Sequence, residues 1–545
     1  MSKVAQYLEE HIHGEVFSTP AIRKYFSTDG SVFKVIPALA VYPRNESDVR
    51  KTTKFTWQLA ERGRVIPITA RGLGTDQSGA AIGNGVVMVF PAHMNRILEF
   101  DGKSGEIVVE PGLNYGKMQQ TLHTHGRFLP AYPSSIEFSS IGGAVANNAS
   151  GEKSYKYGST KEFTKALRVV LANGDVIETR RLSKRELNKK MGLATFEGEV
   201  YRAVDALIEE NKQIIDNAIL PVSKNVAGYA LSEVKRKDGS FDLTPLFVGS
   251  QGTLGVITEI TLKTALFNPE TSLIAAFFDD LALAERVLDE ISSLSDGPSA
   301  IEVVDENLLK FVKTHNPSRL KGIVDDPTPK LVALIEFDSG NSRSQKRITK
   351  KVGKILTKAG VDFRLENDEY EKERLWKIRQ VASSVVSYDE GGVRSLPIID
   401  DAIVPKDKLQ QYIKNIYAIF KNYNLQPAIW GHGGDAHLHV RPFFDLSQVG
   451  DRQKVIKIID EYYGMVIALG GSTSGQLGDG RLRAPYLARL YGSAMYQVFQ
   501  KLKQIFDPYS TLNPGVKIDV STNDIKPLLR HEYSIDHLLH NLPRT

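Results

Sequence analysis

The chain has 545 residues, of which 41% are hydrophobic and 24% are charged. These are ordinary values for a globular protein, and they exclude a collagen-like, coiled-coil or disordered chain. At this length we expect at least two domains, because a single hydrophobic core stops growing near roughly 250 to 300 residues. The net charge of +5 is too small to predict a nucleic-acid partner and favours only a weak attraction for anionic substrates.

Cysteine is absent from the sequence. Its absence excludes disulfides, thiolate zinc sites, iron–sulfur ligation and a cysteine nucleophile, so any bound metal must use His, carboxylate or amide oxygen. The polar N-terminus does not resemble a signal peptide, and the apolar runs Val86–Phe90 and Leu273–Phe278 are too short to span a membrane. The cytoplasm is therefore the expected compartment.

After an N-terminal segment, 1–35, the stretch 36–265 alternates short apolar runs with Gly and Asn turns, a pattern typical of a sheet-rich α+β domain. The predicted strands are Val65–Ile68, Val86–Phe90, Ile107–Val109 and Leu167–Leu171. The dipeptide Asn173-Gly174 is a hairpin signal after the last of these strands. A helix is predicted from the spacing of Val200, Val204, Leu207 and Ile208.

Beyond about residue 265 longer helical segments lie between strands, which predicts a second domain over 266–506 and a tail over 507–545. Pro405 stands at a first helical position. The buried face predicted for that helix is Leu409, Ile413, Ile416 and Phe420. No internal repeat or low-complexity linker is present.

A glycine-rich loop, Pro67–Gly79, lies between two predicted strands. Glycine permits positive φ and close backbone approach, so such a loop can turn its amide N–H groups toward a phosphate. It is not a Rossmann fingerprint, because Gln77 occupies the third glycine position, and it lacks the Gly-Lys-Ser/Thr of a P-loop. Taken alone, the loop fits a structural turn and a phosphate cradle about equally well.

Two further loops favour the cradle. One runs from Pro133 to Gly158 and supplies small residues and amide side chains that can line an elongated polar ligand. The other, Gly249–Thr258, offers another close backbone approach before a strand.

Three histidines, His432, His437 and His439, fall within eight residues beside a glycine-rich turn. This spacing can bring imidazoles together on one metal or one substrate. If 437–440 is a strand, His437 and His439 point to the same side. From the residues alone, metal binding is the minority interpretation of such a cluster.

With its motifs in order from Tyr25–Ser31 and Val41–Asp48 to Asp507–Lys517, the chain resembles the FAD-linked oxidases and dehydrogenases of the vanillyl-alcohol oxidase/p-cresol methylhydroxylase superfamily. The similarity is greatest to the branch with D-lactate and D-2-hydroxyglutarate dehydrogenases and the glycolate oxidase flavin subunit. The resemblance implies an α+β fold with a two-subdomain FAD-binding domain of the p-cresol methylhydroxylase type. An α+β cap domain with an antiparallel sheet would follow, and the tail would return to the FAD domain.

The resemblance also implies a non-covalent FAD. The residues expected to hold it are Arg71, Gly72, Leu73, Gly74, Thr75, Asp76, Ser78, Gly79, Pro133, Ser134, Ser135, Gly142, Gly143, Asn147, Asn148, Ser150, Gly151, Tyr157, Gly158, Gln251, Gly252, Gly255, Val256, Ile257 and Asn513. Without cysteine the chain cannot carry its own iron–sulfur module, so the implied electron acceptor is a separate iron–sulfur or other protein. A position at the inner face of the membrane is compatible with this, and the oligomeric state stays open.

Oxidation of a 2-hydroxy acid on a flavin needs a cation for the carboxylate, a group that lowers the hydroxyl pKa, and a base. By resemblance, Arg379 grips the carboxylate with its planar fork. His432 and His439 match the family's metal-binding histidines, for Zn or Mn, and His437 stands where the family has Asn and could add a ligand.

The downstream segment departs from the family. Gln476 replaces the glutamate that is the third metal ligand, Leu477 replaces the histidine proposed as base, and Gln251 replaces another glutamate. An amide oxygen is a weak neutral ligand, and leucine cannot accept a proton. Three explanations compete: a base supplied by His437 or His432, a substrate that needs no metal, or a weakened flavoprotein.

The leading hypothesis is thus an FAD-dependent oxidoreductase acting on a small 2-hydroxy acid, with Arg379, His432, His437 and His439 around the reacting carbon. The alternative is a flavin-binding subunit or weakened enzyme that works with a separate redox partner. A non-flavin carbohydrate or nucleotide binder would leave the three ordered loops unexplained.

Overall fold

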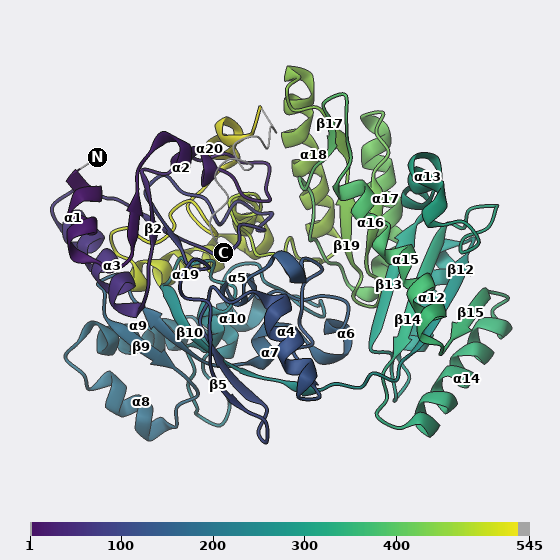
Figure 1. The fold of residues 1–545 in the computed structure, drawn as a ribbon, viewed down its shortest axis with the longest axis horizontal. Helices are drawn as coiled ribbons and strands as arrows, with labels where there is room; N and C mark the ends of the chain where they lie inside the picture. The colour runs from purple at the N-terminus through teal and green to yellow at the C-terminus, as the bar shows by residue number, and fades with distance from the viewer. Residues whose placement is uncertain (1–2, 532–545) are drawn as a thin grey trace.

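The computed structural model of the protein describes residues 3–531. Figure 1 shows two lobes, one built from the N-terminal half of the chain and one from the elements coloured green. Among residues 3–531, every helix is too short or too polar to cross a membrane.

The first sheet of the N-terminal lobe has the strand order β1-β2-β4-β3, with β1 antiparallel to β2 and the other pairs parallel. Its strands are β1 (Glu15–Phe17), β2 (Leu39–Tyr42), β3 (Ile68–Arg71) and β4 (Val86–Val89). The helices nearby in the chain are α1 (Lys3–His11), α2 (Pro20–Tyr25) and α3 (Glu46–Glu61). Apolar residues of α1, α3 and these strands share one core.

The second sheet is antiparallel, in the order β5-β6-β10-β8-β9. Its strands are β5 (Ile97–Asp101), β6 (Glu106–Val109), β8 (Thr164–Val170), β9 (Val176–Thr179) and β10 (Val256–Lys263). A short pair, β7 (Arg127–Phe128) and β11 (Ala265–Leu266), lies apart from it. The predicted hairpin at Asn173-Gly174 is confirmed, because Val170 pairs with Val176 across that turn.

Helices that share the core of this second sheet are α4 (Tyr115–Thr124), α5 (Ile141–Asn147), α7 (Thr160–Phe163), α8 (Lys184–Met191), α9 (Phe196–Glu210), α10 (Lys212–Asn217) and α11 (Thr244–Phe247). The short helix α6 (Ser154–Tyr157) instead faces the other lobe, where Tyr155 packs against that lobe's core. The predicted helix is α9, and all four residues of its predicted apolar face are buried. Helical spacing thus placed one apolar stripe against the sheet.

The other lobe has an antiparallel sheet of order β15-β12-β14-β13-β18-β19. Its strands are β12 (Ser272–Phe278), β13 (Ala300–Asp305), β14 (Leu331–Phe337), β15 (Asp362–Glu366), β18 (Ala428–His432) and β19 (His437–Arg441). A second, small sheet joins β16 (Asp389–Glu390), β17 (Val393–Ser395) and β20 (Phe443–Phe444). Alternate residues of β12, such as Leu273 and Ile274, enter different cores, so the large sheet is covered on both faces.

The helices of this lobe are α12 (Leu281–Ser292), α13 (Glu306–His315), α14 (Ser342–Lys358), α15 (Glu369–Gln380), α16 (Ala382–Val386), α17 (Leu409–Asn422) and α18 (Val449–Ala468). The helix predicted after Pro405 is α17, and the four residues of its predicted face are buried. It begins later than expected, at Leu409, because Pro405 precedes a separate 3₁₀ turn over Lys406–Lys408.

One predicted strand has a different boundary. The run Val65–Ile68 becomes a strand only at Ile68, and β3 continues to Arg71. Pro67 has no N–H for a ladder and offers only its carbonyl, which accepts a hydrogen bond from Val86. Val65 is half exposed.

After the second lobe the described chain returns to the first lobe. The long helix α19 (Leu487–Phe506) packs with α9, and its residues Val498 and Phe499 enter the core of the second sheet. We therefore propose that the cap domain ends near residue 486, earlier than the expected boundary at 506. Beyond α20 (Thr522–Ile525), Leu529 pairs with Phe33 of the N-terminal segment. The last part of the expected tail, 532–545, lies outside the described residues.

Candidate active site

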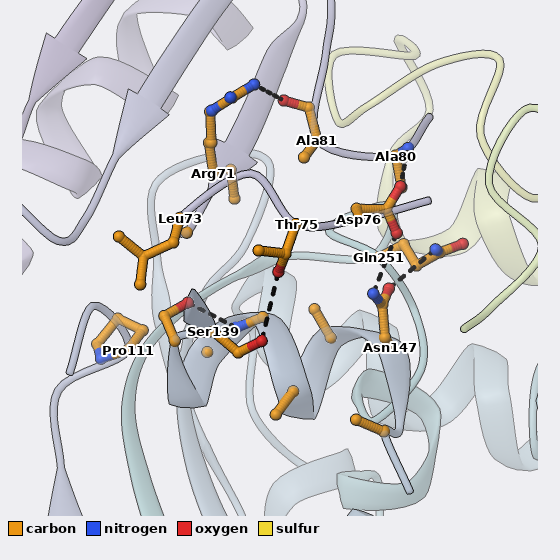
Figure 2. A pocket seen from close by; sticks show the side chains of 18 of the residues that line it. Arg71, Leu73, Thr75, Asp76, Ala80, Ala81, Pro111, Ser139, Asn147 and Gln251 are labelled. Carbon is orange, nitrogen blue, oxygen red and sulfur yellow. Dashed lines mark hydrogen bonds between the residues drawn. The ribbon is translucent and has the colours of Figure 1, made fainter. Parts of the chain in front are cut away.

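A cavity lies where the loop after β3 faces helix α5, and its empty volume is about 1010 Å³ when the space open to solvent is included (Figure 2). The expected cofactor residues that line it are Arg71, Gly72, Leu73, Gly74, Thr75, Asp76, Pro133, Ser135, Gly142, Gly143, Asn147, Gln251, Gly252, Gly255 and Ile257. The three glycine-rich segments singled out from the sequence thus surround one cavity.

Other expected residues do not line it: Ser78, Gly79, Ser134, Asn148, Ser150, Gly151, Tyr157, Gly158, Val256 and Asn513. Residues that were not expected complete the wall: Ala70, Ala80, Ala81, Phe90, Pro111, Ser139, Ser140, Ala144, Ala146, Ala149, Gln476 and Leu477. Most of these are small residues next to the predicted motifs, and that adjacency was the available signal. Gln476 and Leu477 come from the distant segment after α18, and the sequence marked them as departures at the expected metal-ligand and base positions rather than as cofactor residues.

Close backbone packing explains the glycines at this cavity. Gly74 has φ of +78°, a left-handed conformation that favours glycine. A Cβ atom on Gly72 would lie 2.1 Å from the Ser140 Oγ, and one on Gly142 would lie 2.6 Å from the Pro111 Cβ. The walls could not approach as closely with any other residue at these positions.

Gln251 ties the two lobes together at the cavity. Its side-chain amide donates hydrogen bonds to Ser78 Oγ (3.1 Å) and Asn147 Oδ1 (2.9 Å), and its oxygen accepts one from the Gly480 N–H (2.8 Å). Figure 2 shows Asn147 in turn donating to Asp76. A carboxylate at this position could not donate, so the structure accounts for Gln where the resemblance implies Glu.

The three histidines come together on the hairpin of β18 and β19. His432 pairs with His437 and Trp430 with His439 across the hairpin, and the three imidazole centroids lie 5.2 to 5.7 Å apart. All three side chains are buried. His437 and His439 are two residues apart on β19, as expected from the strand period.

Each histidine has its own carboxylate. Glu302 Oε1 lies 2.5 Å from His432 Nδ1, Asp400 Oδ1 lies 2.6 Å from His439 Nδ1, and Asp401 lies 2.9 Å from His437 Nε2. These carboxylates come from elsewhere in the chain and were missed from the sequence. An acid in the middle of the apolar strand β13 and an acid pair within the apolar run 398–404 were the signals that could have revealed them.

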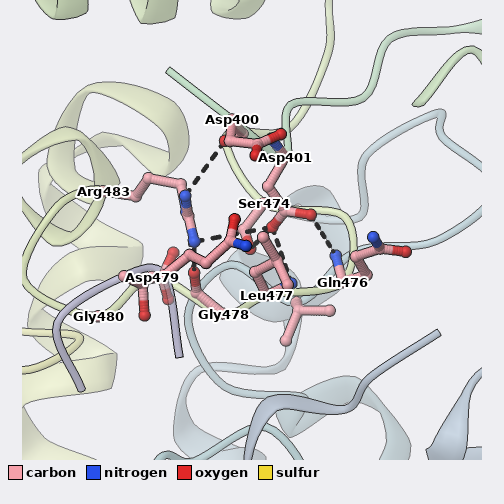
Figure 3. A network of polar contacts seen from close by, with 12 residues as sticks. Asp400, Asp401, Ser474, Gln476, Leu477, Gly478, Asp479, Gly480 and Arg483 are labelled. Atoms are coloured by element: carbon pink, nitrogen blue, oxygen red, sulfur yellow. Dashed lines mark hydrogen bonds and ion pairs between the residues drawn. The ribbon is translucent and has the colours of Figure 1, made fainter. Parts of the chain in front are cut away.

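Figure 3 shows how Asp401 organises the segment that carries Gln476. The Asp401 carboxylate accepts hydrogen bonds from the backbone N–H groups of Gln476 and Leu477 (both 2.9 Å) and from the hydroxyl of Ser474 (2.6 Å). Asp401 therefore fixes the backbone of this segment through these three hydrogen bonds. The Gln476 side chain then lies between two histidines, with Oε1 3.1 Å from His432 Nε2 and its amide nitrogen 3.1 Å from His439 Nε2.

Arg379 lies on α15 and reaches this array through Glu302. Its Nε donates to Glu302 Oε2 at 2.6 Å, so Glu302 joins Arg379 to His432. Within residues 3–531 the terminal nitrogens of Arg379 have no hydrogen-bond partner. A largely shielded guanidinium, with a side chain that is 12% exposed, and an open fork suit a bidentate carboxylate ligand.

Burial dominates the electrostatics of the site. It lowers the pKa of His432 well below the usual value, and it lowers the pKa of His437 to about 4, with the charge of Lys224 acting in the same direction. Burial raises the pKa of Glu302, while Arg379 opposes it. Burial alone would raise the pKa of Asp400, but the charge of Arg441 and the hydrogen bond from His439 outweigh it and hold this pKa below the usual value.

The donor set does not fit a divalent cation. Within the described residues there is no group of three or more His, Asp or Glu side chains placed to hold a metal. His432 and His439 both direct Nε2 at Gln476, a neutral amide, rather than at an anionic ligand. The expected role of the two histidines as metal ligands therefore lacks its third partner.

Comparison with known proteins identifies the two lobes. The sequence pattern "FAD binding domain" matches residues 37–180, and "FAD linked oxidases, C-terminal domain" matches residues 268–516. The chain is 28% identical over 523 residues to D-2-hydroxyglutarate dehydrogenase from Escherichia coli, covering 92% of this chain and 50% of that protein. It thus spans about half the length of the D-2-hydroxyglutarate dehydrogenases that it matches.

Shorter relatives match over most of their length. Glycolate oxidase subunit GlcD from Bacillus subtilis is 29% identical over 488 residues, with 89% of each chain covered. D-lactate dehydrogenase from Anaerostipes hadrus is 25% identical over 492 residues, covering 88% of this chain and 90% of that protein.

Solved structures share the fold. p-Cresol methylhydroxylase with substrate bound has a TM-score of 0.67 at 14% identity, covering 96% of this chain and 97% of that one. 4-Ethylphenol oxidase from Gulosibacter chungangensis has a TM-score of 0.68 at 14% identity, covering 95% and 97%. The expected α+β fold of the p-cresol methylhydroxylase type is confirmed, and the chain belongs to the FAD-linked oxidases.

Proposed function

We propose that this protein is an FAD-dependent oxidoreductase that oxidises a small 2-hydroxy acid of the D-lactate, D-2-hydroxyglutarate or glycolate type. One observation carries the proposal. Gln476 belongs both to the wall of the cofactor cavity and to the array of Arg379, His432 and His439. The cavity therefore ends where a cation and two imidazoles converge, which is the arrangement that a bound hydroxy acid requires.

We propose that FAD occupies the cavity without a covalent link. The proposal is supported by the cavity lining, which among the described residues contains no His, Cys, Tyr or Lys as a nucleophile for such a link. When bound, FAD supplies the acceptor for the hydride that leaves Cα of the substrate.

In this proposal the chain's own residues bind the acid and take its proton. The open fork of Arg379 pairs with the substrate carboxylate, and Glu302 holds that guanidinium in place. Asp400 accepts the Nδ1 proton of His439, which leaves a lone pair on Nε2 for the substrate hydroxyl proton. The substrate must displace the amide hydrogen of Gln476 that occupies this lone pair. Asp400 then stabilises the imidazolium that forms.

His437 does not fit the role of base. Its Nε2 contacts Asp401, its Nδ1 has no partner within the described residues, and the side chain is fully buried. We propose that His437 has a structural role and positions Asp401. His432 contacts Glu302 and Gln476 with its two nitrogens and positions both.

The decisive experiment is anaerobic bleaching of the flavin absorbance by a panel of D- and L-2-hydroxy acids, with and without added zinc or manganese. We expect one acid to bleach the flavin without added metal. Dithionite serves as the control for a reducible flavin. A folded protein that is colourless after reconstitution with FAD would refute the proposal.

A second candidate is a flavin-binding subunit or weakened enzyme that works with a separate electron-acceptor protein. Leu477 in the cavity wall favours it, because this residue stands where the family has its proposed base and cannot accept a proton. A flavin that dithionite reduces but no hydroxy acid bleaches would support this alternative.

We also propose that the protein works in the cytoplasm at the inner face of the membrane. Support comes from α14, which carries seven Lys and Arg and no Asp or Glu. Such a helix can bind an anionic lipid surface without spanning it.

A further inference from the structure

The strongest departure from a metal-dependent site is the position of the Gln476 side chain. It lies between His432 Nε2 and His439 Nε2, at 3.1 Å from each. Two nitrogens directed at one point would normally share a cation. Here one carboxamide joins them.

The proton positions along this contact follow from its neighbours. Lys224 Nζ donates to Ser150 Oγ (3.2 Å), and the Ser150 hydroxyl donates to Gln476 Oε1 (3.0 Å). Because ammonium is only a donor, Ser150 Oγ accepts from Lys224 and keeps its own proton for Gln476 Oε1, which places the carboxamide oxygen on the Ser150 side. The Gln476 amide nitrogen then donates to His439 Nε2, whose Nδ1–H donates to Asp400.

The other histidine must adapt to the oxygen that faces it. Gln476 Oε1 can only accept, so His432 carries a proton on Nε2 and donates it. Its Nδ1 shares a second proton with Glu302. His432 therefore has no Nε2 lone pair for a cation, and that of His439 is occupied by the amide.

We propose that Gln476 is an amide clasp that takes the place of the divalent cation, so that the site works without metal. The clasp joins His432 to His439 and keeps the His439 lone pair directed toward the cavity wall. To bind a cation, the site would have to break both contacts and remove a proton from His432 Nε2, with no anionic ligand in return. Gln476 is thus a positioning residue; this inference rests on the proposed function, but its test needs no substrate.

The test is zinc content after equilibrium dialysis of the FAD-loaded protein against micromolar zinc, with FAD content as the measure of folding. We expect the wild type to retain almost no zinc. Gln476→Glu supplies an anionic oxygen between the histidines and should retain about one zinc per protein. The double variant Gln476→Glu/His432→Ala should lose that zinc again.

Gln77→Glu is the matched control. It adds a carboxylate to the same region, but its side chain contacts Arg441 rather than the histidines. We expect no zinc in this variant, and zinc there would mean that any added acid recruits the metal, which would contradict the inference.

Two further results would contradict the proposal that Gln476 takes the place of the cation. One is a wild-type protein that holds one zinc and loses it on His439→Ala. The other is folded, FAD-loaded Gln476→Glu that binds no zinc. If Gln476→Glu does not fold, the wild-type and His439→Ala zinc contents still decide the question. Failure of the proposed function would appear separately, as absence of flavin bleaching with any acid.

Discussion

Arg379 is the residue on which substrate binding is expected to depend most. Its Nε donates to Glu302, while its terminal nitrogens have no hydrogen-bond partner in the part of the chain that the structure describes. We expect Arg379→Lys to raise KM about 10- to 100-fold, because a point charge replaces a bidentate fork and about 1.5 to 3 kcal/mol of charged hydrogen bonding is lost. Steady-state kinetics with the acid that bleaches the flavin would measure this.

The lysine variant is preferable to alanine because it preserves a charge beside buried Glu302. Arg374→Lys, five residues earlier on α15 and paired with Glu371, is the matched control and should leave KM unchanged. Equal KM values for wild type and Arg379→Lys would remove Arg379 from the substrate site.

His437 gives the fold a specific dependence on pH. Burial lowers its pKa to about 4 in the folded protein, from an ordinary value near 6.5. The unfolded chain therefore binds the proton first, and stability is lost as pH falls from about 6.5 to 4, by at most roughly 1.4 kcal/mol per pH unit for this group. Urea unfolding monitored between these pH values should show the loss.

Other buried histidines also lower the stability of the fold as pH falls. The test therefore compares the pH dependence of the unfolding free energy between the wild type and a His437 variant. His437→Gln removes one titrating group and keeps a donor for Asp401. Its unfolding free energy should fall less steeply with decreasing pH than that of the wild type. Parallel slopes would show that His437 does not titrate differently in the folded and unfolded states.

At the scale of elements, the β18–β19 hairpin brings the histidines together, and Gly431 permits its close pairing. Gly431 has φ of +149°, and a Cβ there would lie 2.5 Å from the backbone oxygen of His437. We expect Gly431→Ala to destabilise the fold by about 1 to 3 kcal/mol through strain at this contact. Thermal melting would measure it.

Gly450 is the matched control, because it lies in α18 with open space where a Cβ would stand. Gly450→Ala should be neutral or stabilising by about 0.5 to 1 kcal/mol, since alanine favours helix. If both variants melt alike, close pairing at Gly431 is not what constrains the hairpin.

Elements with a strong local signal were predicted well. The periods of α9 and α17 identified their buried faces, and Asn-Gly identified the β8–β9 turn. The sequence pattern that specifies each of these elements lies within a few residues, so it can be recognised without knowledge of the tertiary structure. The start of β3 was missed because apolar character extends through Pro67, whereas the hydrogen-bond ladder does not.

The site was only partly predictable, because the partners of its residues are far apart in the sequence. The histidines and the glycine-rich loops are visible as motifs, but their partners are remote: Glu302 lies 130 residues from His432, and Ser150 lies 326 residues from Gln476. No local pattern states which carboxylate meets which imidazole. The sequence could therefore mark Gln476 as a departure, but it could not show the bridge that its side chain makes.

At the scale of the whole molecule, positive charge is concentrated on α14. This helix carries +7, whereas the whole chain carries +5, so the remainder has a net charge of −2. The cations fall at helical spacing on one exposed face: Arg343, Lys346, Arg347, Lys350, Lys351, Lys354 and Lys358. Within the described residues only Arg347 has an ion pair, with Asp296. Figure 1 places α14 at the outer edge of the second lobe, away from the first.

This stripe should bind anionic membranes by charge alone, because the apolar face of α14, including Ile348 and Val352, is buried in the protein and cannot insert into lipid. We expect sedimentation with phosphatidylglycerol vesicles at low salt and release as ionic strength rises, since screening shortens the reach of each charge. Phosphatidylcholine vesicles should not bind the protein.

Charge-reversal variants of α14 test whether this helix makes the contact with the vesicle surface. Lys350→Glu/Lys351→Glu/Lys354→Glu should weaken vesicle binding by on the order of a hundredfold or more, because each basic residue near an anionic surface contributes about 1 kcal/mol. Lys184→Glu/Arg185→Glu/Lys189→Glu makes the same change in net charge on α8, in the other lobe. If both triple variants lose binding equally, attraction follows net charge rather than the α14 stripe. If neither does, the protein does not bind the membrane through α14, and an acidic protein would be the expected partner of the stripe.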